Sequence, residues 1–167
     1  MILTKPEILK LIKKGKIKIT HFNQSAIGPA SIDLTLDNKI RIFSLKSPQI
    51  VEENVNYHKI TRIKDISKGY MLKPGELVLG ITKEKITLPE NICGWLNSRS
   101  RFARIGLMSH ITAPFVCPGV SNNQILEIFN SSKHKIKLIP NTRICQLVLQ
   151  ECKGKAKYEG IFKNQKL

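Results

Sequence analysis

Residues 135–150 read KIKLIPNTRICQLVLQ, two short apolar runs with Pro140 and Asn141 between them. Short runs that are rich in β-branched residues and bounded by Gly, Pro or Asn predict β-strands. More runs of this kind lie upstream, and their close spacing predicts a mainly β fold, a sandwich or jelly roll, rather than alternating β and α units. The predicted strands cover residues 16–20, 31–36, 39–43, 76–81, 85–88, 124–129, 135–139 and 143–150.

A short helix is predicted at the N-terminus, over residues 4–14. Thr4 and Glu7 have the spacing of a capping box, and Gly15 follows the last turn as a stop signal. The apolar residues of this segment recur at helical spacing and form one face. They are Ile8, Leu9, Leu11 and Ile12.

Two long stretches are polar. Residues 44–69 are rich in Lys and Asn and predict a long loop with one weak strand. Residues 153–167 form a basic tail, which we expect to be mobile unless something orders it. No internal repeat or linker divides the sequence, so we expect a single domain over residues 1–167.

The composition is that of a globular protein. The chain has 167 residues, of which 41% are hydrophobic, which is enough to bury one core. No apolar run approaches the roughly 20 residues of a membrane helix, and the N-terminus lacks the pattern of a secretory signal. We therefore expect a cytoplasmic protein that does not bind a membrane.

The charge is strongly positive, at +16. Such a surplus favours polyanionic partners, namely nucleic acid, anionic membrane or phosphorylated small molecules, although lysine-rich faces also serve solubility alone. Aromatic residues make up only 6% and no nucleic-acid motif is present, which argues against a nucleic-acid partner. Arginine is scarce, yet Arg99, Arg101 and Arg104 fall within six residues.

The four cysteines show no CxxC spacing, and we expect them to be reduced and mostly buried. They are Cys93, Cys117, Cys145 and Cys152. The H-x-E and P-C-x-x-C signature of zinc deaminases is absent, so no zinc site is predicted.

Residues 98–104 read SRSRFAR and combine two hydroxyls with three guanidiniums. Hydroxyl groups, free backbone N–H groups at a turn and arginine side chains together can bind phosphate. The stretch therefore predicts a phosphate cradle; the alternative is a solvated basic turn.

Glu127 is a lone carboxylate in the predicted strand 124–129, where alternation places it on one face with Ile125 and Phe129. If that face borders a pocket, partial burial is expected to raise the pKa of Glu127 and let it shuttle a proton. The alternative is an outward-facing Glu on a sheet edge. His110, taken alone, is more typical of a core or loop histidine than of a catalyst.

In their order along the chain, these segments resemble the dCTP deaminase and dUTPase superfamily, and more closely its deaminase branch. The resemblance covers nearly the whole chain, with the long loop as its loosest part. The matching segments are residues 28–34, 72–76, 88–89, 98–104, 112–113, 118–119, 126–127, 146–147 and 157–160.

The resemblance implies a distorted jelly roll of the dUTPase-like β-clip type, assembled as a homotrimer with active sites at subunit boundaries. It also implies a triphosphate bound with Mg²⁺ and a deamination without zinc. Glu127 matches the general acid/base that activates water for attack on cytosine C4 and returns the proton to the leaving ammonia.

The resemblance further implies roles for the remaining site residues. Residues for phosphate or for positioning the base and water are Arg99, Ser100 and Arg104, with Arg101 beside them. Residues whose backbone would read the pyrimidine edge are Thr112, Ala113, Ile125 and Leu126. Other nucleotide-binding positions are Gln146, Lys157 and Tyr158, and the tail would close over the bound triphosphate.

The sequence departs from the family pattern at four places. Cys117 replaces an Asp that ordinarily contacts the deoxyribose 3′-hydroxyl, and a thiol is a poor hydrogen-bond acceptor. Asn122 or Asn123 would then have to compensate, and these asparagines themselves replace a segment that normally contains Gly. Arg101 replaces a second Ser, and Ile161 replaces a Gln in the tail.

Four functions stay open at this point. The first is deamination of dCTP to dUTP and ammonia, favoured by Glu127. The second is a dUTPase, or a bifunctional enzyme giving dUMP and diphosphate, which the loss of the acid at Cys117 disfavours. The third is a non-catalytic nucleotide-binding relative, and the fourth is a nucleic-acid-binding module.

Overall fold

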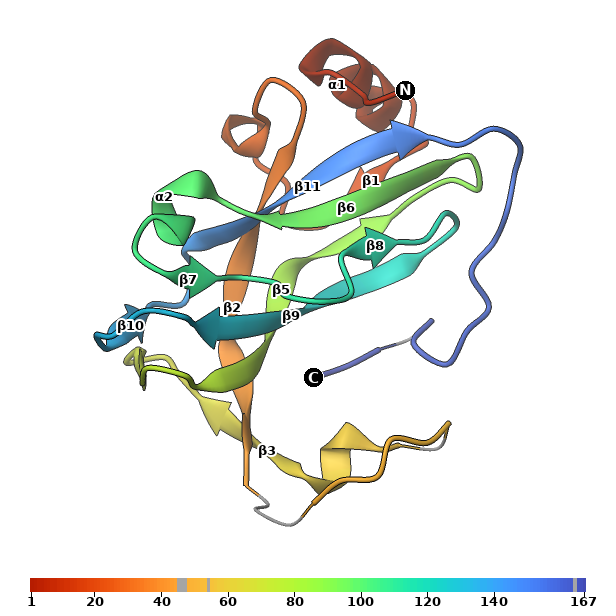
Figure 1. The fold of residues 1–167 in the computed structure, drawn as a ribbon. Coiled ribbons are helices and arrows are strands. Elements are labelled where there is room, and N and C mark those ends of the chain that lie inside the picture. The colour runs from red at the N-terminus through yellow and green to blue at the C-terminus, as the bar shows by residue number, and fades with distance from the viewer. Residues whose placement is uncertain (45–47, 54, 164) are drawn as a thin grey trace.

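The computed structural model describes residues 1–44, 48–53, 55–163 and 165–167. Strands dominate it (Figure 1). They are β1 (Lys18–Ile19), β2 (Ile32–Phe43), β3 (Thr61–Asp65), β4 (Tyr70–Leu72), β5 (Leu77–Thr87), β6 (Ile92–Ser98), β7 (Leu107–Met108), β8 (Phe115–Val116), β9 (Ser121–Asn130), β10 (Ile136–Leu138) and β11 (Arg143–Glu151). The helices are α1 (Lys5–Lys13), α2 (Ser100–Ala103) and the 3₁₀ turns η1 (Gln24–Ala26) and η2 (Tyr57–Lys59).

All strand pairs in these residues are antiparallel. The main sheet runs β7-β9-β5-β2-β11-β6-β8, with β1 beside β5 and β3 beside β2, and β10 pairs with β4 separately. The long strand β2 joins two layers, because its first half pairs with β11 and its second half with β5 and β3. The register shifts between Leu36 and Ile40, where the strand passes from one layer to the other.

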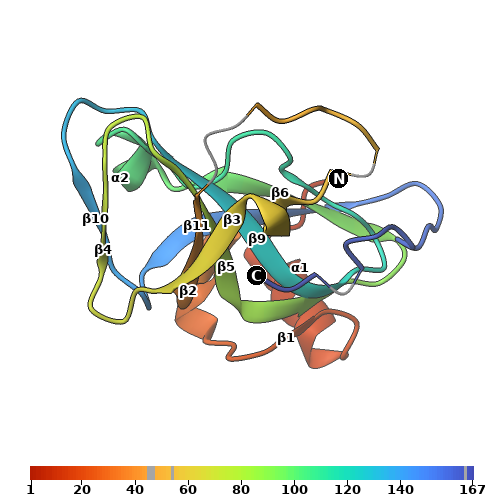
Figure 2. The same cartoon turned by 90° about the horizontal axis from the view of Figure 1, so that it is seen from below.

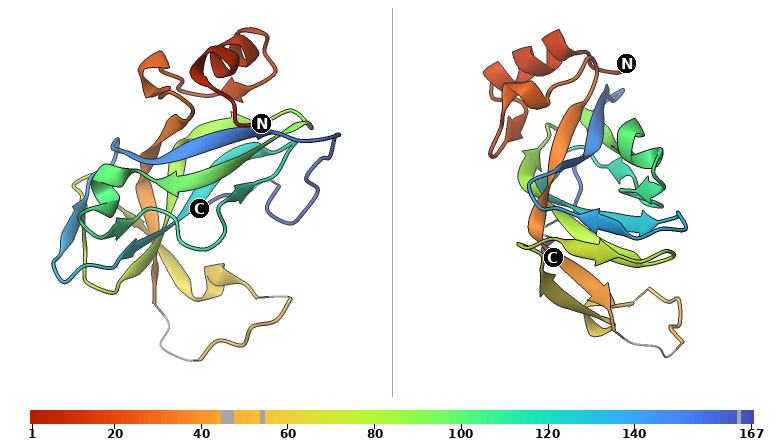
Figure 3. Two further views of the ribbon diagram at one scale, coloured as in Figure 1. Left: turned by 45° about the horizontal axis from the view of Figure 1, so that its top comes forward. Right: turned by 90° about the vertical axis from the view of Figure 1, so that its left-hand side faces the viewer.

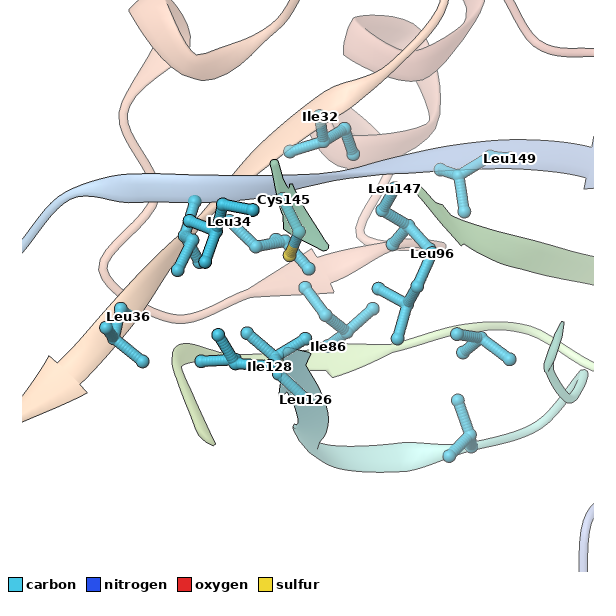
Figure 4. Packing of buried hydrophobic residues seen from close by; sticks show 14 of the residues in the cluster. Ile32, Leu34, Leu36, Ile86, Leu96, Leu126, Ile128, Cys145, Leu147 and Leu149 are labelled. Carbon is cyan, nitrogen blue, oxygen red and sulfur yellow. The ribbon is translucent and has the colours of Figure 1, made fainter. Parts of the chain in front are cut away.

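The two layers enclose the core. Figure 4 shows apolar side chains from β11 and β6 meeting those from β5 and β9. Leu34, Leu126, Ile128 and Leu147 are each 0% exposed, and full burial of such a side chain contributes about 1.5–3 kcal/mol. The predicted mainly β sandwich is therefore confirmed, with helix α1 at one end of it (Figure 3).

Most predicted strands are found, but two pairs of them prove to be single strands. Predictions 31–36 and 39–43 both lie in β2, and predictions 76–81 and 85–88 both lie in β5. Each strand continues through a register shift, between Leu36 and Ile40 in β2 and between Ile81 and Lys85 in β5. The polar residues there suggest the end of a strand in the sequence, but in the structure they form bulges. The weak strand expected within 44–69 is β3, and residues 45–47 and 54 of that stretch lie outside the described residues.

The predicted helix is present as α1, and its apolar face is confirmed. Ile8 is buried, and Leu9, Leu11 and Ile12 pack against the core. The predicted capping box is wrong: the Thr4 side chain makes no capping bond, and Glu7 instead accepts hydrogen bonds from Lys10 Nζ at 3.1 and 3.2 Å. Within the described ranges, no helix has the length and apolar character needed to cross a bilayer.

Candidate active site

A cavity of about 560 Å³ lies between β9, the segment from residue 110 to 120 and the C-terminal tail. In Figures 1 and 2 the tail leaves β11 and returns across the sheet near β9. The lining residues are Phe43, Tyr57, Leu77, Leu79, Leu96, His110, Ile111, Thr112, Ala113, Phe115, Val116, Cys117, Val120, Asn122, Gln124, Ile125, Glu127, Tyr158, Phe162 and Gln165.

Glu127 stands in this cavity because of strand alternation. Leu126 and Ile128 point into the core, so Glu127 points to the opposite face of β9, with Ile125 and Phe129. The main-chain N–H of Thr112 donates to Glu127 Oε2 at 2.6 Å, and the Thr112 hydroxyl donates to the same oxygen at 2.8 Å. The carboxylate is thus half-buried and held in one orientation.

The pKa of Glu127 is lowered, which contradicts the raised value expected from the sequence. Burial alone raises it, but the two hydrogen bonds from Thr112, with contributions from nearby His110 and the N–H of Ile111, together lower the pKa further than burial raises it. These contacts stabilise the charged form. Glu127 is therefore a carboxylate at neutral pH, ready to accept a proton.

His110, which also lines the cavity, contacts the backbone of β9. The Glu127 N–H donates to His110 Nδ1 at 3.3 Å, which leaves Nε2 as the ring nitrogen that carries hydrogen. That Nε2 is buried and has no hydrogen-bond partner among the described residues. The sequence interpretation missed this contact, since nothing in the local pattern around His110 indicates it.

The structure brings part of the predicted site together in the cavity. The predicted residues found in its lining are Glu127, Thr112, Ala113, Cys117, Ile125 and Tyr158. Leu126 is 0% exposed in the core, so only its backbone is available for the predicted base contact.

Other predicted residues do not line the cavity: Arg99, Ser100, Arg101, Arg104, Gln146 and Lys157. Arg99 pairs with Asp33 (Nη2 to Oδ2, 2.9 Å) and donates from Nη1 to the carbonyl of Arg143 at 2.7 Å. Gln146 lies opposite Asp33 in the pairing of β11 with β2. A second polar cluster thus forms where α2, β2 and β11 meet.

The residues that line the cavity and the polar cluster where α2, β2 and β11 meet differ in charge. Among the described residues, the cavity lining contains neither Lys nor Arg. The Asp33 carboxyl, by contrast, is surrounded by arginines. Burial raises its pKa, and the charges of Arg99, Arg143 and Arg101 act in the opposite direction. Among the residues that the structure describes, the cavity of one chain therefore offers a proton acceptor but no cation for a triphosphate.

The tail is held against the cavity by amide side chains that the sequence analysis did not assign to it. Asn122, 5% exposed, receives a hydrogen bond from Gln124 Nε2 at 2.7 Å and donates to the carbonyl of Phe162 at 3.0 Å. Gln165 donates to the carbonyl of Asn123 at 2.8 Å. The tail expected to be mobile is thus ordered by contacts within its own chain.

Tyr57 of η2 gives the tail a further contact, because its hydroxyl donates to the Lys166 carbonyl at 3.2 Å.

No group of three or more His, Cys, Asp or Glu side chains with the geometry to hold a metal ion occurs in the described part of the chain.

Known proteins resemble this chain over most of its length. A sequence model described as dCTP deaminase-like matches residues 2–152. A dCTP deaminase of Pseudoalteromonas atlantica is 38% identical over 176 residues, covering 95% of this chain and 88% of the relative. A protein of Corynebacterium efficiens named dCTP deaminase, dUMP-forming, is 35% identical over 151 residues, covering 89% and 78%.

Solved structures share the fold. The 2′-deoxycytidine 5′-triphosphate deaminase from Agrobacterium tumefaciens matches with a TM-score of 0.71 at 20% identity, over 89% of this chain and 48% of that one. This chain thus spans about half the length of that protein. A mutant of the dUTPase from phage phi11 of S. aureus matches with a TM-score of 0.53 at 13% identity, over 87% and 96%.

Proposed function

Because the chain belongs to the dCTP deaminase-like family, we propose that it deaminates dCTP to dUTP and ammonia. The observation that carries the proposal is the Glu127 carboxylate in the cavity wall, held by Thr112 and kept charged. We take the substrate to be the magnesium complex of the triphosphate, and the cytoplasm to be where the reaction occurs.

In the proposed reaction Glu127 removes a proton from a water molecule. The resulting hydroxide attacks C4 of cytosine, and the proton then passes through Glu127 to the departing amino group, so that dCTP and water become dUTP and ammonia. The lowered pKa keeps Glu127 deprotonated before the first step, but it also makes the carboxylate a weaker base toward water. The same shift makes protonated Glu127 a ready donor to the leaving group.

Triphosphate binding is proposed to involve a second copy of the chain. The cavity lining has no Lys or Arg among the described residues, whereas Arg99, Ser100 and Arg104 lie outside it on or beside α2. A homotrimer with sites at its subunit boundaries would supply these groups to the cavity from a neighbouring subunit. In that subunit Asp33 would pair with Arg99, and Gln146 would lie opposite Asp33. Lys157 and Tyr158 would contribute from the tail.

A second activity, hydrolysis of dUTP to dUMP and diphosphate, has one observation in its favour. The relatives that this chain matches over most of its length include proteins named dCTP deaminase, dUMP-forming. Cys117 argues against it, because this cavity residue is a thiol and therefore a poor acceptor for orienting water. Deamination is therefore the main proposal.

The test is product analysis by chromatography after incubation with Mg²⁺ and either dCTP or dUTP. We expect dUTP and ammonia from dCTP, and a fall of about 10²–10⁴-fold in turnover for Glu127→Gln with nucleotide binding retained. The matched control is Glu90→Gln, a carboxylate outside the cavity lining. Wild-type turnover in Glu127→Gln would remove the assigned role, and dUMP as the product would establish the second activity.

A further inference from the structure

Trp95 marks a line of contacts across three strands on the outer face of the sheet. Its ring packs against Phe115 of β8, with centroids 5.0 Å apart, and the two residues are directly opposite in the pairing of β6 with β8. Its Nε1 donates to Gln150 Oε1 of β11 at 3.3 Å, a diagonal contact, since Trp95 is opposite Val148.

Two residues along the chain from each of these three side chains lies a cysteine, within β6 in one case and just past the ends of β8 and β11 in the other two. Cys93 precedes Trp95 by two residues, Cys117 follows Phe115 by two, and Cys152 follows Gln150 by two. Because side chains alternate between faces, the three thiols share the face of Trp95. If the pairing continues, Cys93 lies directly opposite Cys117 and diagonally from Cys152, just as Trp95 lies directly opposite Phe115 and diagonally from Gln150.

Hydrogen bonds and one pKa shift describe the surroundings of this thiol row (Cys117, Cys93 and Cys152). The Cys152 N–H donates to the carbonyl of Asn91 at 2.8 Å, so the ladder between β6 and β11 extends to Cys152. Burial raises the pKa of Cys93 to about 11, and the adjacent Cys152 thiol adds to the shift, with Cys117 making a smaller contribution. The Cys93 side chain leans toward β11, because its S–H donates to the Gln150 carbonyl at 3.6 Å, and Cys152 is the thiol on that side.

We propose that Cys93 and Cys152 are a dithiol site that a hydroperoxide converts to an intramolecular disulfide. The oxidant first meets Cys152, because this residue is partly exposed while Cys93 is only 5% exposed. The Cys152 sulfur attacks the peroxide oxygen, giving a sulfenic acid and an alcohol, or water if the oxidant is hydrogen peroxide. Cys93 then displaces hydroxide from that sulfur, and the thiol proton leaves with it as water.

The bond would join the tail to the sheet. Cys152 is the first residue after β11, where the chain leaves for the cavity. A disulfide to Cys93 would fasten this point to β6, while Cys117 would keep its thiol in the cavity wall. Cys145 is fully buried on the opposite face of β11 and takes no part.

Thiol counting and peptide mapping test the site without reference to enzymatic activity. The protein is treated with a small excess of hydrogen peroxide, unfolded, and titrated for free thiols. We expect the count to fall from four to two, reversibly with dithiothreitol, and a Cys93–Cys152 cross-linked peptide by mass spectrometry.

Two variants separate the partners. Cys117→Ser should still lose two thiols, and Cys152→Ser should lose no pair. A cross-link between Cys93 and Cys117, an intermolecular disulfide, or an unchanged count of four at peroxide levels that oxidise free glutathione would overturn the assignment.

Discussion

Thr112 contacts Glu127 twice, through its amide and through its hydroxyl. Thr112→Val removes the hydroxyl and leaves the amide. Since the lost bond stabilises the charged carboxylate, the pKa of Glu127 should rise. The acid limb of the kcat/KM profile should therefore move to higher pH, with little change at alkaline pH, as measured by deaminase assays across the pH range.

Thr112→Ser is the control for this shift, because it keeps the hydroxyl and removes only a methyl group. Its acid limb should match that of the wild type. Should Thr112→Val also match the wild type, the Thr112 hydroxyl would have no part in holding Glu127 charged.

For the single residue Glu127, the sequence predicted the face of the strand on which it lies but not the direction of its pKa shift. Alternation along β9 is a local property, and it placed Glu127 beside Ile125 correctly. The contact with Thr112 joins residues fifteen positions apart, and it depends on how the loop before β8 folds back. No local pattern encodes that path, so burial was the only effect that the sequence could weigh.

The tail is an element whose order depends on Asn122. This side chain donates to the carbonyls of Phe162 and Lys163, at 3.0 and 3.5 Å. Asn122→Ala removes both bonds, which share the Nδ2 donor and together count as about one typical hydrogen bond, about 0.5–1.5 kcal/mol net. Amide hydrogen exchange in residues 157–167 should accelerate by about two- to tenfold in the nucleotide-free protein.

Asn123→Ala provides the matched comparison. The Asn123 side chain donates to the carbonyls of Thr82 and Lys83 in β5, and only its backbone carbonyl receives the tail, from Gln165. Exchange should therefore rise near Thr82 and stay unchanged in the tail. Equal tail exchange in both variants would show that Asn122 does not anchor it.

Strand boundaries show why elements are only partly readable from sequence. The polar run from Lys83 to Lys85 resembles a loop, yet Glu84 is 7% exposed within β5 and accepts the Thr35 N–H at 2.8 Å. A partner from β2 satisfies this buried carboxylate. Strand β6 was missed because Gly94 weakens the pattern, although a Cβ there would lie 2.7 Å from Leu147 Cδ1.

For the whole molecule, the main question is how the two groups of site residues meet. The mainly β sandwich follows from strand patterns, but the separation of the arginines beside α2 from the cavity has no signature in sequence. The family resemblance assigns residues 98–104 and Glu127 to the same kind of site. The fold instead pairs Arg99 with Asp33, away from the cavity.

Subunit complementation tests the proposal that neighbouring copies complete each site. Glu127→Gln and Arg104→Ala should each inactivate a homotrimer, the first at the proton acceptor and the second at the triphosphate. If each site takes Glu127 from one subunit and Arg104 from another, unfolding the two variants together and refolding them as an equal mixture should restore activity. Random assembly would give about a quarter of the wild-type rate, because each intact residue occurs at half of the positions.

The mixed sample is compared with each variant refolded alone, and light scattering reports the oligomer. A mixture no more active than the two separate variants, together with a trimeric mass, would place Arg104 and Glu127 in the same subunit's site and require the tail or α2 to move. A monomeric mass with full wild-type activity would show that one chain suffices. Restored activity in a trimer would explain why the cavity of a single chain has an acceptor for protons and, among its described residues, no cation for phosphate.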